Sequence, residues 1–175
     1  MSRREDAVYS AQVIASWASR YLPARPATVL SQADQGEVTV QETGETRFSQ
    51  SIAVGPHLLR ADEPPSVGGE DSGPTPYGLL LASLGACTSM TRRMYANRKK
   101  LPLKRVTVHL RHKKIHAKDC EECDTGEGMI DRIETEIRLE GDLNESQQER
   151  LLEIASRCPV HRTLHSEVAI RSRLA

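Results

Sequence analysis

Cys87 lies where a thiol could carry out chemistry, inside the apolar or small-residue stretch 79–87. The stretch predicts a buried helix, because its residues are apolar or small on nearly every face. A lone cysteine in such a helix is most often a small hydrophobic residue. If Cys87 is reactive, its thiolate needs a nearby cation, which the sequence alone does not identify.

Cys158 is the second candidate, and its surroundings differ. Pro159 suits the first position of a helix and would leave Cys158 at the N-cap. A helix N-terminus lowers the pKa of a thiol, and His161 and Arg162 could add positive charge. The alternative is a plain Cys-Pro that only ends the preceding helix.

Cys120 and Cys123 form a C-x-x-C in the acidic loop 118–128. A closed zinc site needs four ligands, and Cys120, Cys123 and His116 supply three without a second cysteine pair. A redox pair is the other possibility, but the flanking carboxylates raise thiol pKa values. We expect a plain exposed loop without a metal, and we keep the zinc site and the redox pair as weaker alternatives.

The N-terminal part predicts an accessory helix over 5–22, and we treat residues 1–26 as an extension before a single domain, 27–175. Short β-rich segments separated by glycines then predict an antiparallel meander. These segments are 27–30, 37–41, 47–54 and 57–62.

A central helix is predicted from Thr75, its N-cap, and Pro76 to about Asn97. Alternating segments at 106–111 and 133–139 predict half-buried strands. Asn144 and Gln147 predict a capping box, opening a helix that ends at Cys158. The residues expected to face the core from this helix are Leu151, Leu152, Ile154 and Ala155. A final strand over 167–173 completes an α+β fold.

The chain has 24 basic and 24 acidic residues, so its field favours neither nucleic acid nor anionic membranes as partners. It shows no continuous apolar segment of signal-peptide or membrane-spanning length, and we expect a cytoplasmic protein with mostly reduced thiols. Aromatic residues make up only 3%. A monomer with so little large apolar surface covers its central helix poorly, which favours a homodimer.

Two motifs resemble those of the OsmC/Ohr family (osmotically inducible protein C / organic hydroperoxide resistance). Residues 73–91, Gly-Pro-Thr-Pro through Cys87, resemble its central-helix motif, and 158–164, Cys-Pro-Val-His-Arg-Thr-Leu, resemble its second-cysteine motif. They occur in the family's order, and the resemblance extends over about 27–174.

The resemblance implies antiparallel sheets wrapped around long central helices in an intertwined homodimer, with active sites at the interface. It also implies a thiol-dependent peroxidase of oxidative stress defence without a cofactor. In that reaction Cys87 reduces an organic hydroperoxide or hydrogen peroxide and becomes a sulfenic acid. A Cys87–Cys158 disulfide then forms, which a dithiol reductant reopens.

One position departs from the family pattern. Peroxidase members carry a Glu after the helix-opening Pro, paired with an Arg that contacts the thiolate, whereas Tyr77 stands here. Glu63 or Glu70 could replace that carboxylate, and Arg60 is the nearest upstream arginine.

The helical spacing around Cys87 predicts an apolar substrate pocket that would favour alkyl hydroperoxides. We expect it to be lined by Tyr77, Leu80, Leu84 and Met90. Because the family Glu is missing, two other functions stay open. One is a non-catalytic dimer that binds a small apolar or thiol-reactive ligand, and the other is a regulatory partner of another enzyme.

Overall fold

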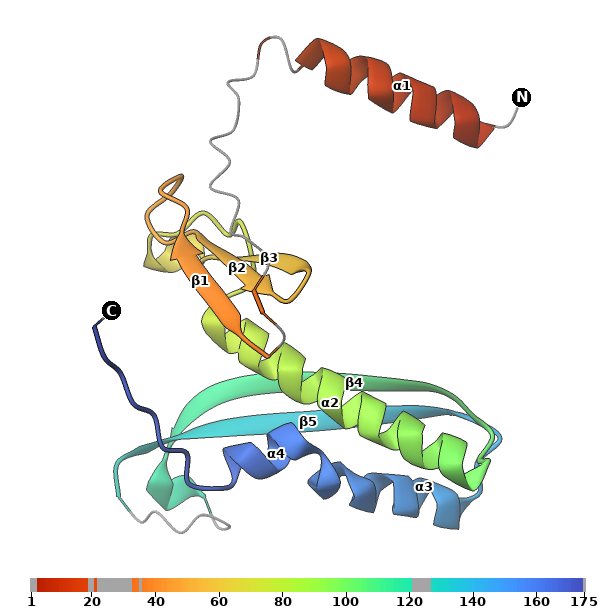
Figure 1. The fold of residues 1–175 in the computed structure, drawn as a ribbon. Coiled ribbons are helices and arrows are strands. Elements are labelled where there is room, and N and C mark those ends of the chain that lie inside the picture. Colours follow the sequence, from red (N-terminus) through yellow and green to blue (C-terminus); the bar gives the residue numbers. More distant parts are fainter. Residues whose placement is uncertain (1–2, 19–20, 22–32, 35, 121–126, 175) are drawn as a thin grey trace.

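Two antiparallel sheets and one long helix form the framework of the computed structural model, which describes residues 3–18, 21, 33–34, 36–120 and 127–174 (Figure 1). The mixture of helices with antiparallel sheets confirms the α+β prediction. The N-terminal helix α1 (Arg3–Ala18) lies apart from the rest of the molecule (Figure 1).

The first sheet is a meander of β1 (Val38–Glu42), β2 (Gln50–Val54) and β3 (His57–Ala61). The strands pair antiparallel in the order β1-β2-β3, as the glycine-punctuated sequence predicts. A short 3₁₀ turn, η1 (Pro65–Val67), lies in the loop that follows. The predicted strand over 27–30 falls outside the described residues.

The second sheet is one long hairpin of β4 (Leu103–His116) and β5 (Met129–Gly141). Both strands extend well beyond the alternating cores that predicted them, because each pairs with the other along almost its full length. The 3₁₀ turn η2 (Ala117–Asp119) follows β4.

The central helix α2 (Pro76–Lys99) lies across this hairpin (Figure 1). It begins where predicted, because the Thr75 hydroxyl accepts a hydrogen bond from the Gly78 N–H at 3.0 Å. Gly85 sets the closeness of α2 to β4, since a Cβ there would lie 2.8 Å from Cδ1 of Leu110.

Helix α3 (Glu145–Glu153) opens with the predicted capping box, in which Asn144 and Gln147 each bond the other's backbone N–H. The 3₁₀ helix η3 (Ile154–Arg157) and helix α4 (Pro159–Leu164) follow, and both pack against α2. Leu151 forms a buried cluster with Ala96 of α2 and Leu103 of β4. This cluster fixes the chain that leads to Cys158.

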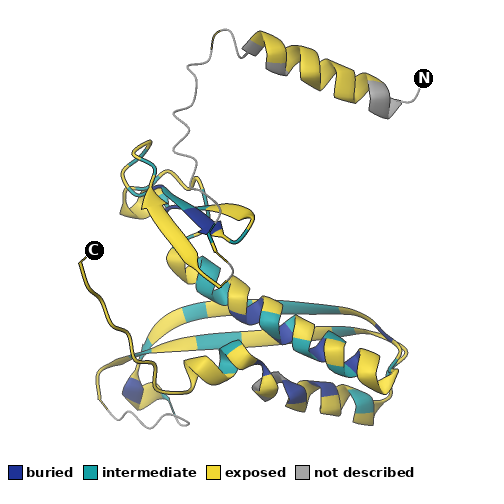
Figure 2. Ribbon diagram, in the orientation of Figure 1, coloured by how far each residue is buried: buried dark blue, intermediate teal, exposed yellow. Residues whose placement is uncertain are grey.

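Three expectations about the core and the tail are wrong or only partly met. Leu152 is 50% exposed, because the α3 face that carries Leu151 alone reaches α2. Residues 167–173 form no strand and are exposed, because no described strand pairs with them. Helix α2 is buried along one face only, since the hairpin and the C-terminal helices of one chain cover no more of it (Figure 2). The side chain of Ala155 lies outside the described residues.

Candidate active site

The buried face of α2 carries a stripe of residues four positions apart, Leu84, Thr88, Arg92 and Ala96. Residues at this spacing lie one above the other on a helix. The stripe faces the C-terminal segment, because η3 and α4 pack on α2. Cys87 lies beside the stripe and is partly exposed.

Cys158 is brought to this face by the turn between η3 and α4. It is the N-cap of α4, with Pro159 at the first helical position, as the sequence predicts. Its side chain is completely buried, at 0% exposure. Cys158 is therefore enclosed by the protein, whereas Cys87 keeps a route to solvent.

The two cysteine side chains interact directly, and each perturbs the other's proton affinity. Burial, together with a hydrogen bond and charge from Cys158, raises the pKa of Cys87. These effects outweigh the Val160 N–H and the Thr91 hydroxyl, which act in the opposite direction. A hydrogen-bonded pair of thiols titrates as a unit.

The surroundings of Cys158 favour the thiolate form of its side chain. Burial alone would raise its pKa, but hydrogen bonds from Cys87, the His161 N–H, the Thr88 hydroxyl and the Val160 N–H hold the pKa below its ordinary value. The Cys158 side chain makes no capping bond of standard geometry. We therefore attribute the lowered pKa of Cys158 to several weak donors around its sulfur.

Arg92 is the site residue that the sequence did not reveal. Its side chain is 0% exposed, and Nη1 donates to the Thr88 carbonyl at 3.0 Å. Burial lowers the pKa of Arg92, and the charge of Cys158 raises it. The available signal was a charged residue in line with Leu84, Thr88 and Ala96 at a spacing of four residues.

The other predicted charged residues have different surroundings. Arg60, on β3, pairs with Glu45 and lies 3.5 Å from the Ser49 hydroxyl. Glu63 follows β3, and its backbone bonds the buried carboxylate of Asp62. None of the described interactions brings Arg60 or Glu63 to the cysteines. Arg162 is exposed on α4.

Asp62 organises the loop between β3 and α2. Burial would raise the pKa of Asp62, but hydrogen bonds from Ser72, Glu63 and Glu70 outweigh it and lower the pKa. The Glu70 contribution is its backbone N–H, at 3.2 Å. The loop is thus held around a different carboxylate from the two that the sequence suggested.

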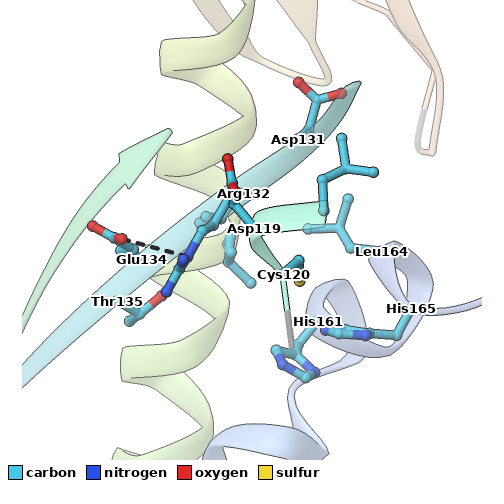
Figure 3. A pocket seen from close by; sticks show the side chains of 12 residues that line it. Asp119, Cys120, Asp131, Arg132, Glu134, Thr135, His161, Leu164 and His165 are labelled. Carbon is cyan, nitrogen blue, oxygen red and sulfur yellow. Dashed lines mark ion pairs between the residues drawn. The ribbon is translucent and has the colours of Figure 1, made fainter. Parts of the chain in front are cut away.

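A cavity of about 840 Å³ lies between β5 and α4 (Figure 3), and some of its lining residues are close in sequence to the two cysteines. Leu84, three residues before Cys87, lines it from α2, and His161, three residues after Cys158, lines it from α4. The remaining lining residues are Asp119, Cys120, Ile130, Asp131, Arg132, Ile133, Glu134, Thr135, Leu164 and His165. Apolar and charged groups are thus mixed in its wall.

The predicted pocket residues have different surroundings. Tyr77 stacks on His112 with ring centroids 4.2 Å apart and hydrogen-bonds to Asp131. Met90 is 63% exposed and lines a separate groove with Met94. Leu80 is partly buried one turn before Leu84.

The acidic loop is described in part. Cys120 is disulfide-bonded, whereas Cys87 and Cys158 are free thiols. His116 ends β4, and Cys123 lies outside the described residues. Within the described part of the chain, no three His, Cys, Asp or Glu side chains are grouped to hold a metal ion.

Fold and site together define a protein with antiparallel sheets and a long central helix, in which a thiol on that helix interacts with a second thiol at the start of α4. The family model of the OsmC-like protein matches residues 69–173, more than half of the chain. The chain therefore belongs to the OsmC-like family, which confirms the resemblance seen in its two motifs.

Solved structures show the same fold. An osmotic stress induced and detoxification response protein from Psychrobacter arcticus aligns at a TM-score of 0.59 and 16% identity, over 77% of this chain and 91% of that one. An OsmC like protein from Mycoplasma pneumoniae aligns at 0.58 and 18%, over 76% and 89%. An organic hydroperoxide resistance protein OsmC from Legionella pneumophila aligns at 0.53 and 20%, over 78% and 90%.

The search of curated proteins finds no match. None of the described helices combines the length and apolar character needed to span a bilayer.

Proposed function

We propose that this protein is a thiol-dependent peroxidase that reduces organic hydroperoxides or hydrogen peroxide through Cys87 and Cys158. The observation that carries the proposal is the direct interaction of two free thiols, one partly exposed and one fully buried. A peroxide can reach Cys87 from solvent, and the second sulfur is already beside it. Relatives of the same fold that are named for hydroperoxide resistance add support.

The different environments of the two sulfurs suggest the division of labour. Cys158 has the lowered pKa, and in this proposal its thiolate accepts the Cys87 proton as the attack begins. The Cys87 sulfur attacks one peroxide oxygen and the O–O bond breaks. The other oxygen takes up the proton that Cys158 accepted and leaves as an alcohol, or as water from hydrogen peroxide, and Cys87 becomes a sulfenic acid.

The Cys158 sulfur then attacks the Cys87 sulfur, and water leaves as the disulfide forms. A dithiol reductant restores both thiols by two exchange steps and is itself oxidised to a disulfide. One peroxide is thus reduced with two electrons from the dithiol. We place this cycle in the cytoplasm, where thiol reductants are abundant.

We also propose that the working form is a homodimer. In the single chain, apolar side chains of the first sheet are exposed on β1 and β3, including Val38, Val40 and Leu58. The hydrophobic face of a sheet must be buried against another element. A second chain would supply it.

A dithiol-driven peroxide consumption assay tests the proposal. The wild type should consume many equivalents of peroxide per chain, whereas Cys87→Ser should consume none. Cys158→Ser should stop after one equivalent with Cys87 as a sulfenic acid. Cys120→Ser is the matched control and should turn over.

Peptide mapping after one equivalent of peroxide should find the Cys87–Cys158 disulfide. Stoichiometric consumption by the wild type would instead favour a ligand-binding protein. Retained turnover in Cys87→Ser with complete loss in Cys158→Ser would reverse the two roles.

A further inference from the structure

Arg92 is a buried cation without a carboxylate partner among the described residues. It has no solvent exposure, and its Nε and Nη2 atoms have no hydrogen-bond partner in that part of the chain. Only Nη1 is bonded, to the carbonyl of Thr88 on the same helix. Two donor nitrogens of a permanent positive charge are therefore available inside the protein.

A buried charge of this kind is costly unless an opposite charge lies nearby. Cys158 is the group whose charge acts on Arg92, and it is just as deeply buried. Thr88 links the two, since its carbonyl holds the guanidinium and its hydroxyl interacts with the Cys158 sulfur. A negative charge on Cys158 would offset the cost of burying the Arg92 charge.

The neighbouring arginine shows that this placement is specific. Arg93 points to β4, where Nη1 donates to the Leu103 carbonyl at 2.6 Å and Nη2 to the Lys104 carbonyl at 2.9 Å. Its donors are satisfied by backbone acceptors of the hairpin. Two consecutive arginines thus serve different ends, one joining helix to sheet and the other facing the second cysteine.

We propose that Arg92 is the positioning residue of the dithiol, whose guanidinium holds the Cys158 thiolate in place and stabilises its charge. This inference rests on the proposed peroxidase function, because it supplies the anion that accepts the Cys87 proton. It also gives the site a cation from its own central helix, without Arg60 or Arg162. Burial of the Arg92 charge has a desolvation cost, so Arg92 contributes little to the free energy of folding.

The test titrates one thiol at a time and needs no peroxidase activity. In a Cys87→Ser background, the ultraviolet absorbance of the Cys158 thiolate is followed against pH, with the Cys87→Ser/Cys158→Ser protein as the blank. Arg92→Met, Arg92→Lys and Arg93→Met are compared in that background. Urea unfolding of each protein is measured alongside.

Arg92→Met should lower the thiolate fraction at neutral pH about tenfold or more, as expected for the loss of an opposite charge at close range. Arg92→Lys should restore much of it, because the positive charge returns. Arg93→Met should leave the titration unchanged. Arg92→Met should be about as stable as the Arg92 protein, because Cys158 becomes a neutral thiol when the cation is removed and no buried charge is left unpaired.

An unchanged titration in Arg92→Met would overturn the proposal. So would a strong loss of stability in that variant without a change in titration, since Arg92 would then pair with another group for structural reasons. A normal Arg92 effect in a protein that lacks peroxide turnover would leave this inference standing and refute the proposed function alone.

Discussion

Leu151 anchors α3, and its truncation tests how the chain holds Cys158 against the central helix. The side chain is 0% exposed and contacts the cluster formed with Ala96 and Leu103. Leu151→Ala removes most of that contact. Leu152→Ala removes the same atoms from the next position, which is 50% exposed, and so serves as the matched control.

The expected cost follows from burial. Truncating a fully buried leucine costs about 2.7 to 5.0 kcal/mol, because the transfer free energy is lost and a cavity remains. The cluster around Leu151 is closely packed, with partly buried hydrophobic side chains against it, so the cavity would be only partly filled by relaxation. We therefore expect Leu151→Ala to lower the free energy of unfolding by about 3 to 4 kcal/mol, and Leu152→Ala by about 0.5 kcal/mol or less.

Urea unfolding measures the difference. With a slope of about 2 kcal/mol/M, a loss of about 3 kcal/mol moves the midpoint by about 1.5 M. All proteins are compared at one concentration, because a dimer's midpoint depends on it. Equal losses in the two variants, or a loss below about 1 kcal/mol for Leu151→Ala, would refute the described packing of α3.

Three further predictions concern the site and the assembly. Thr88→Val removes the hydroxyl beside Cys158. Because such a hydrogen bond is worth about 1.5 kcal/mol, we expect about tenfold less Cys158 thiolate at neutral pH in an absorbance titration. Ser83→Ala is the control, since the Ser83 hydroxyl donates to a backbone carbonyl. Burial and, to a lesser degree, His165 lower the pKa of His161, so its contribution to stability is present above the ordinary histidine pKa and is lost as the pH falls through the lowered one. The thermal unfolding temperature of His161→Gln should therefore fall less between about pH 7 and pH 5 than that of the wild type. An identical fall in both proteins would argue against this. Light scattering should report about twice the chain mass, and a stable monomer at micromolar concentration would contradict the dimer.

Local features were predictable because they depend on neighbouring residues. The Thr75 cap and the Asn144–Gln147 capping box need only side chains and backbone N–H groups a few positions away, and the Cys158 N-cap position follows from Pro159 at the first helical position. The meander was visible for the same reason, since glycine turns divide short β-rich segments. The two family motifs lie in these local elements, so membership was also readable.

Predictions from hydrophobic periodicity were wrong where the tertiary structure provides no packing partner. Val168 and Ile170 alternate as in a strand, but a strand needs a partner, and both are exposed at 55% and 85%. Leu152 fits the helical period as well as Leu151 does, yet only one of them faces α2. Period alone does not say how wide the covered face of a helix is.

The sequence by itself indicated most of the helices and strands, the family, and the two cysteines that we propose as the reactive pair. Only the tertiary structure showed that Cys158 interacts with Cys87, that its pKa is lowered while that of Cys87 is raised, and that the buried Arg92 lies close enough to interact with the charge of Cys158. Proton affinity depends on burial and on groups distant along the chain, which become neighbours only when α4 packs on α2. The role of a single buried arginine on a helix can be inferred only when the element that packs against it is known.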